Sequence, residues 1–71
     1  MPKLHTSDGI IKVLQRKGFA FISQRGSHAK FQKKTRIRIF TVIIPANKKE
    51  IPHGTFRSIL RQSGLRAEDF E

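Results

Sequence analysis

The segment Gly26, Ser27 and His28 carries the chemistry that this sequence could perform. A glycine followed by a small polar residue is typical of a tight turn, so we expect the imidazole of His28 to be displayed at a hairpin bend. An imidazole has a reference pKa of about 6.5 and can therefore accept or donate a proton near neutrality. The chain has fifteen Lys and Arg against five Asp and Glu, a formal net charge of +10. A proton-transfer group in so positive a field suits cleavage of a phosphodiester.

The chemistry that His28 could supply is cleavage of RNA through its own 2′-hydroxyl. A base removes that proton, an acid protonates the departing 5′-oxygen, and cations stabilise the extra charge on phosphorus. This route needs no metal and no cofactor. His5 and His53 are candidates for the second proton-transfer group by residue type alone, and a loop or cap role is the more ordinary explanation of each. The three histidines lack the spacing of a zinc site.

The excess of positive charge favours a polyanionic partner. The basic residues are spread over 12–17, 30–38, 48–49 and 57–66, and no stretch forms a basic amphipathic helix with an exposed hydrophobic face. Nucleic acid therefore ranks above an anionic membrane. The sequence has no cysteine, and its longest apolar stretch, 42–46, is too short to span a bilayer. We expect a cytoplasmic protein with no membrane partner.

Two amphipathic helices are predicted, one near each end of the chain. Apolar residues at helical spacing predict the first over 7–17, with Ser7 as its N-cap and Gly18 after its last turn. The second begins at Gly54 or Thr55 and ends at Gly64. It buries Phe56, Ile59 and Leu60. Residues 65–71 could form a short turn of helix or a frayed tail.

Three strands are predicted between the helices. Residues 19–24 and 28–34 form a hairpin around the turn 25–27, and a third strand runs from Arg36 to Pro45. The chain should be a single domain over 1–71 with the order α-β-β-β-α, an α+β two-layer sandwich with helices on one face of the sheet and solvent on the other.

Side-chain alternation assigns residues to the two faces of this sheet. If Phe31 points into the core, His28, Lys30 and Gln32 share the solvent face. Strict alternation in the third strand would turn Ile37 and Ile39 inward, and Arg36 and Arg38 toward the histidine. A bulge around residues 40–42 could reverse this pattern, since both parities there are apolar.

Several segments together resemble the HicA-type (YcfA) mRNA interferases, the toxins of bacterial toxin–antitoxin pairs. The similar segments cover nearly the whole chain: the first helix ending in Gly18-Phe19, the turn 24–28 (Gln-Arg-Gly-Ser-His), the strand ending in Ile44-Pro45, and 51–62 (Ile-Pro-His-Gly-Thr-Phe-Arg-Ser-Ile-Leu-Arg-Gln). The resemblance implies a fold like that of double-stranded-RNA-binding domains, ribonuclease activity on mRNA, and neutralisation by a HicB-like antitoxin. A homodimer and a toxin–antitoxin hetero-oligomer are both open.

By position, the resemblance makes His28 the catalytic residue, presented by the turn residues Gly26 and Ser27. Some relatives have a histidine near Asn47 and a tyrosine at Phe31, and this chain has neither. The basic residues expected to bind RNA around the histidine are Arg25, Lys30, Lys33, Lys34, Arg36 and Arg38.

Two other functions are compatible with the same composition. A non-catalytic module for double-stranded RNA would read the shape of the duplex through phosphate and 2′-hydroxyl contacts. A basic protein–protein adaptor would bind polyanions without preference for RNA. The role of His28 separates the enzyme from the binding module, because only the enzyme depends on its imidazole.

Overall fold

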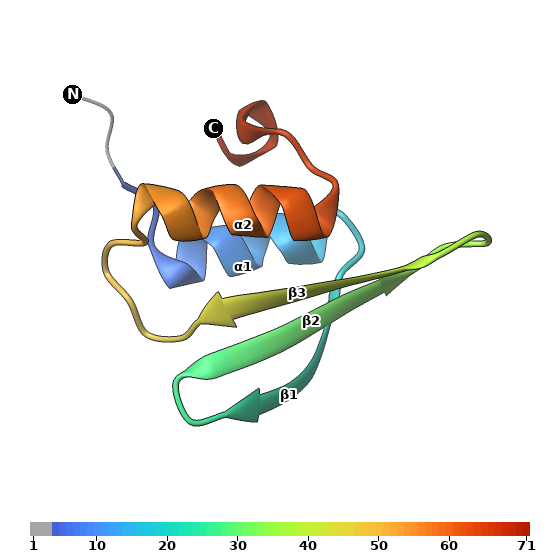
Figure 1. Cartoon of the computed structure of the whole chain (residues 1–71), viewed down its shortest axis with the longest axis horizontal. Coiled ribbons are helices and arrows are strands. Elements are labelled where there is room, and N and C mark those ends of the chain that lie inside the picture. The colour runs from blue at the N-terminus through green and yellow to red at the C-terminus, as the bar shows by residue number, and fades with distance from the viewer. Residues whose placement is uncertain (1–3) are drawn as a thin grey trace.

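The computed structural model describes residues 4–71. Its elements follow in the order α1 (Ser7–Arg16), β1 (Ala20–Arg25), β2 (His28–Lys34), β3 (Ile39–Pro45), α2 (His53–Ser63) and the short 3-10 helix η1 (Ala67–Phe70). Both helices lie on one side of the three-stranded sheet (Figure 1). The predicted order and the α+β class are therefore confirmed. Within these described residues no helix is long and apolar enough to cross a bilayer.

The central strand β2 determines which residues face the helices. It pairs antiparallel with β3 without interruption from His28–Pro45 to Lys34–Ile39, and with β1 through a register shift between Phe21 and Ser23. Ala29 and Phe31 are buried, whereas His28 is exposed. The predicted alternation along β2 is confirmed, and the residues on the solvent face of this strand are His28, Lys30, Gln32 and Lys34.

The hydrophobic core lies between this sheet and the helices. Ile10 and Leu14 of α1, Ile44 of β3 and Ile59 of α2 are fully buried, as is Ile51 in the loop before α2. Both helices therefore contribute side chains to one buried cluster with the sheet. That cluster fixes which face of the sheet remains for solvent.

The third strand begins later than predicted. Thr35–Arg38 form a turn in which the N–H of Thr35 donates to the carbonyl of Arg38 at 2.9 Å. Ile37 is 90% exposed and Ile39 is 56% exposed, so the prediction that they point inward is wrong. Alternation alone could not decide which residues of β3 face the core, because residues 39–44 are apolar on both faces apart from Thr41. The fully buried positions of β3 are Val42 and Ile44.

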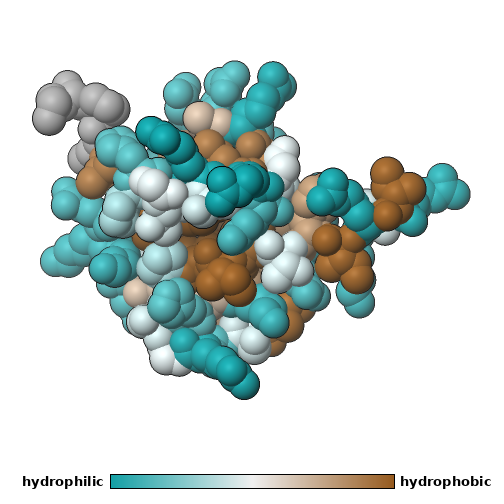
Figure 2. Space-filling view, in the orientation of Figure 1, coloured by the Kyte–Doolittle hydropathy of each residue, from teal (hydrophilic) through white to brown (hydrophobic). Residues whose placement is uncertain are grey.

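The hairpin that joins β2 to β3 extends beyond the helices. Figure 1 shows the two strands continuing past the end of the helical layer, and Figure 2 shows brown hydrophobic side chains among teal hydrophilic ones on this projection. The outer edge of β3 is covered nearer its end by α2, where the N–H of Ile43 donates to the side chain of Gln62 at 3.0 Å. Covering an edge in this way removes a site for unwanted strand pairing.

Helix α1 begins at Ser7, as predicted, but with a different cap, and α2 begins earlier than predicted. Thr6, not Ser7, caps α1, because its hydroxyl accepts a hydrogen bond from the N–H of Gly9 at 2.9 Å. Helix α2 begins at His53, directly after Pro52, and no side chain caps it. Its end is as predicted, with Gly64 in the left-handed region at φ 73°.

The C-terminal residues form a short helix, as one of the two predicted alternatives stated. Phe70 is buried and packs edge-on against Phe56 of α2, with ring centroids 5.3 Å apart. Asp69 forms an ion pair with Lys17 at 3.5 Å and accepts a hydrogen bond from the N–H of Arg66 at 2.9 Å. The segment therefore closes the helical layer.

The first testable prediction concerns Asp69 and pH. The N–H of Arg66, and then the ammonium of Lys17, hold the pKa of Asp69 below its ordinary value of 3.8. A pKa lowered by folding stabilises the protein above the unfolded pKa, and that stabilisation is lost as pH falls through the folded pKa. Asp69→Asn should therefore lower the melting temperature at pH 7, with the difference from the parent shrinking on acidification. Thermal unfolding followed by circular dichroism measures this.

The matched control is Glu68→Gln, which removes the same charge from the neighbouring exposed residue. It should change the melting temperature less than Asp69→Asn at pH 7. The prediction would be contradicted if the difference in melting temperature between Asp69→Asn and the parent stayed constant down to strongly acidic pH.

Candidate functional site

The site is built on the turn between β1 and β2. Arg25, the last residue of β1, pairs with His28, the first residue of β2. Between them Gly26 has φ 55°, in the left-handed region that glycine adopts without steric cost. The side-chain amide of Gln24 donates to the carbonyl of Gly26 at 3.0 Å and holds the bend from one side. The turn predicted over 25–27 is confirmed at 26–27, and Arg25 belongs to β1.

Two rows of side chains cross the sheet at this end. The first row is Arg25, His28 and Pro45, and the second is Ser23, Lys30 and Ile43. Residues opposite one another in adjacent strands have Cβ atoms about 4.5–5.5 Å apart, and successive rows on one face are roughly 6–7 Å apart. The Cβ atom of His28 therefore lies within about 7 Å of the Cβ atoms of Arg25 and Lys30.

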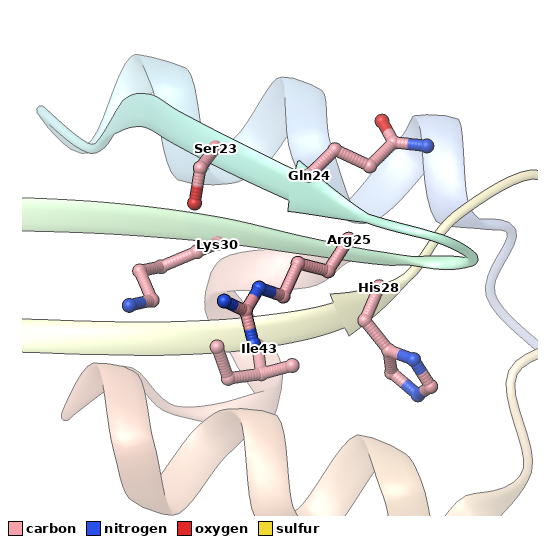
Figure 3. A pocket seen from close by; sticks show the side chains of 6 residues that line it. All are labelled: Ser23, Gln24, Arg25, His28, Lys30 and Ile43. Atoms are coloured by element: carbon pink, nitrogen blue, oxygen red, sulfur yellow. The ribbon is translucent and has the colours of Figure 1, made fainter.

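A hollow of about 640 Å³ lies over these rows. Figure 3 shows Arg25 extending across the strands toward Ile43, with Lys30 on one side and His28 on the other, whereas Gln24 points away. The residues that line the hollow are Ser23, Gln24, Arg25, His28, Lys30 and Ile43.

The electrostatic character of the hollow is positive. Its lining contains a guanidinium and an ammonium but no carboxylate. Arginine presents a planar set of donors that fits phosphate oxygens, and lysine adds a compact charge. The hollow can therefore hold a phosphate beside the imidazole of His28.

A second set of contacts holds the turn before His28 from the side of β3. The carbonyl of Ser27 accepts a hydrogen bond from the N–H of Ala46 at 2.6 Å. The buried hydroxyl of Ser7 donates to the carbonyl of Pro45 at 2.6 Å and accepts from the N–H of Lys48 at 2.9 Å. Helix α1 thereby holds the loop after β3 in place. That loop in turn holds the turn before His28.

Sequence reasoning missed this role of Ser7, which it interpreted as an N-cap. The signal was ambiguous, because Thr6 and Ser7 are consecutive hydroxyl residues before a helical pattern. Only the approach of residues 45–48, some forty positions later, distinguishes them. Ile43 was likewise missed as a lining residue, because strict alternation from Ile37 and Ile39 would turn it into the core.

The structure divides the six cations predicted to bind RNA. Arg25 and Lys30 lie beside His28, and Lys34 lies on the same face at the far end of β2. A seven-residue strand rises about 20 Å from its first residue to its last, so Lys34 is distant from the imidazole. The expectation that residues 33, 34 and 36 lie beside His28 is wrong, because residues 33 and 34 lie at the far end of β2 and residue 36 lies in the turn between β2 and β3.

Two of these cations lie on the helix side of the sheet, and a third lies outside the strands. Lys33 pairs with Phe40 on the helix side of the sheet, with its ammonium 6.0 Å from the ring centroid of Phe19. The guanidinium of Arg38 lies 4.4 Å from the ring centroid of Phe40, on the same side. Arg36 lies in the turn 35–38. The prediction that Arg36 and Arg38 share the face of His28 is therefore wrong.

The other histidines have different surroundings. The ring of His5 stacks on Phe56 with centroids 4.5 Å apart, which is a packing role. His53 is exposed at the start of α2. Across residues 4–71, no group of three His, Cys, Asp or Glu side chains is placed to hold a metal ion.

Asn47 follows Ala46, the residue that donates to the turn. It is exposed and has φ 58°, a left-handed conformation that asparagine adopts more readily than most residues. Asn47 therefore meets a backbone requirement of the loop that holds the turn before His28.

Comparison with known proteins adds a family to this geometry. A model of the family described as the HicA toxin of bacterial toxin–antitoxin systems matches residues 7–65. The match includes α1, all three strands and α2. A search of curated proteins found no matching relative.

The turn glycine gives a second testable prediction. A Cβ added at Gly26 or at Gly54 would meet no atom within 4 Å, but only Gly26 has a positive φ. Gly26→Ala should therefore lower the free energy of unfolding by about 1–2 kcal/mol through backbone strain alone. Gly54→Ala, within α2, should leave it unchanged or raise it by up to about 1 kcal/mol. Urea denaturation of both variants measures the contrast, and equal effects would contradict it.

Removing the hydroxyl of Ser7 gives a third prediction. Ser7→Ala leaves the carbonyl of Pro45 and the N–H of Lys48 without this partner in a buried place, so it should destabilise the protein by about 1–3 kcal/mol. It should also speed hydrogen exchange at the amide of Ala46. Ser58→Ala is the control, because that hydroxyl donates to Gly54 within its own helix at 3.3 Å. Protection at Ala46 that is unchanged in Ser7→Ala would contradict the link.

Proposed function

Because the chain belongs to the HicA family of bacterial toxins, we propose that it is an endoribonuclease that cleaves mRNA and is neutralised by a HicB-like antitoxin. The observation that carries the proposal is the placement of His28 on a fixed turn of the solvent face, flanked by Arg25 and Lys30. The α-β-β-β-α order supports the fold like that of double-stranded-RNA-binding domains that the family resemblance implies.

The proposed reaction is transesterification within the RNA. An imidazole nitrogen of His28 takes the proton of a ribose 2′-hydroxyl, and the 2′-oxygen forms a bond to the adjacent phosphorus. The bond from phosphorus to the 5′-oxygen breaks, and that oxygen takes a proton from water, from the ammonium of Lys30 or from a second protomer. The products are a 2′,3′-cyclic phosphate and a 5′-hydroxyl. Assistance by one general base contributes ~10²- to 10⁴-fold.

Arg25 and Lys30 stabilise the charge that develops on the phosphate oxygens. Both line the hollow that holds His28, and the donors are in place before the reaction, which is the arrangement that lowers a barrier. Lys34 extends the positive face along β2. RNA bound at His28 would follow this strand, with Lys30 and Lys34 contacting successive parts of its backbone.

The second candidate is a non-catalytic RNA-binding module. It is favoured by one observation: among the described residues no side chain hydrogen-bonds the imidazole of His28, whereas catalytic bases are often oriented by a third group. Such a module would bind RNA through the same cations, and the imidazole would be dispensable.

The experiment compares cleavage of a long single-stranded RNA by the parent, His28→Ala and His28→Gln, with EDTA present. The enzyme should lose at least about 100-fold in rate in both variants, because each removes the titratable group. End-group analysis of the parent's products should show cyclic phosphate and 5′-hydroxyl termini. Retained folding is checked by circular dichroism.

His53→Ala is the matched control, since it removes an exposed histidine outside the hollow and should leave the rate within about threefold. Cleavage by His28→Ala at the parent's rate would overturn the proposed mechanism. If neither the parent nor its variants cleave RNA, yet all bind it equally, the binding module is the correct function.

A further inference from the structure

The distal end of the β2–β3 hairpin carries an apolar surface that the proposed reaction does not use. We call Thr35–Arg38 together with Ile39 the distal tip. Ile37 is 90% exposed and Ile39 is 56% exposed, the two largest exposed fractions of any large hydrophobic side chain in residues 4–71. Figure 2 shows hydrophobic side chains on this projection, away from the body of the protein.

The distal tip is held in one conformation by hydrogen bonds. The hydroxyl of Thr35 donates to the carbonyl of Arg38 at 3.0 Å and accepts from the N–H of Arg38 at 3.1 Å. The N–H of Thr35 donates to the same carbonyl at 2.9 Å. A turn fixed in advance loses little conformational freedom when it binds, so it presents Ile37 ready for a partner.

Positive charge surrounds the exposed isoleucines. Arg36 and Arg38 flank Ile37 in the sequence, and Lys34 pairs with Ile39 across the two strands. The guanidinium of Arg38 is positioned by the ring of Phe40. Exposed apolar side chains with charged residues beside them resemble the composition of a protein interface, which has an apolar centre and a polar rim.

We propose that the distal tip is a docking site for a protein surface with an apolar pocket rimmed by carboxylates, and that the antitoxin supplies this surface. The assignment rests on the proposed pairing with an antitoxin. Charge complementarity favours an acidic partner, since three cations of the hairpin end, Lys34, Arg36 and Arg38, would repel the same three on a second copy. RNA would use the cations but not an aliphatic side chain, which neither stacks on bases nor hydrogen-bonds phosphate.

This site is separate from the catalytic turn. The seven residues of β2 place the distal tip about 20 Å or more from His28. An antitoxin that binds only at the distal tip does not touch the imidazole of His28. A larger antitoxin surface that covers the whole solvent face of the sheet contacts both the distal tip and His28. The distal tip therefore contributes affinity independently of the residues that cleave RNA.

The experiment measures the dissociation constant of the purified cognate antitoxin by calorimetry, with RNA cleavage and RNA binding followed in parallel. Ile37→Ser should weaken antitoxin binding at least 10-fold, with its RNA cleavage rate unchanged. Arg36→Glu combined with Arg38→Glu should weaken it further, chiefly through slower association at low salt. Ile22→Ser is the matched control, an exposed isoleucine on β1, and should change the constant less than threefold.

Each other outcome overturns the assignment. If the parent and Ile37→Ser bind the antitoxin equally well, the distal tip is not the docking site, although the proposed pairing with an antitoxin stands. The same conclusion follows if Ile37→Ser and Ile22→Ser lose equal antitoxin affinity. Loss of RNA binding in Ile37→Ser with unchanged antitoxin affinity would assign the surface to RNA. A parent dimer that Ile37→Ser converts to a monomer would assign it to a second copy. No complex with the antitoxin at all would reject the pairing and the assignment together.

Discussion

The two-residue alternation of β2 is the constraint on which the rest of this structure depends. Ala29 and Phe31 are buried beneath the helices, so the residues between and beside them must face solvent. One geometric rule thus produces both the core and the positive face that carries His28. A shift of one residue in register would bury the imidazole and expose the phenyl ring, which the uninterrupted pairing with β3 prevents.

The position of His28 depends on a second constraint, which comes from segments distant in sequence. The turn before it is held by Gln24 from within the hairpin and by Ala46 from the loop after β3. Ser7 then ties that loop to α1. The exposed imidazole is therefore carried on a backbone that three elements fix, although no side chain of the described residues orients its ring.

The sequence was sufficient for the order of elements, the class of fold and the turn at His28, because each has a strong local signal. Apolar residues at helical spacing identify α1 and α2, and Gly26 identifies the bend. It was insufficient for the parity of β3, since residues 39–44 are largely apolar on both faces and the turn at Thr35 is closed by a side-chain hydroxyl. The separation of Lys34 from His28 is already implied by the predicted strand 28–34, whose two ends lie about 20 Å apart, so the expectation that Lys34 lies beside the histidine did not follow from the predicted elements.

That separation changes how the net charge of +10 is understood. The cations do not form one surface around the imidazole: Arg25 and Lys30 lie at one end of the hairpin, and Arg36 and Arg38 lie at the other. Over a distance of about 20 Å, roughly two Debye lengths at physiological ionic strength, charges at the two ends act almost independently. In the proposed reaction, a phosphate at His28 would therefore be bound mainly by Arg25 and Lys30. The charge at the far end, and the isoleucines beside it, would be left for recognition of a different partner.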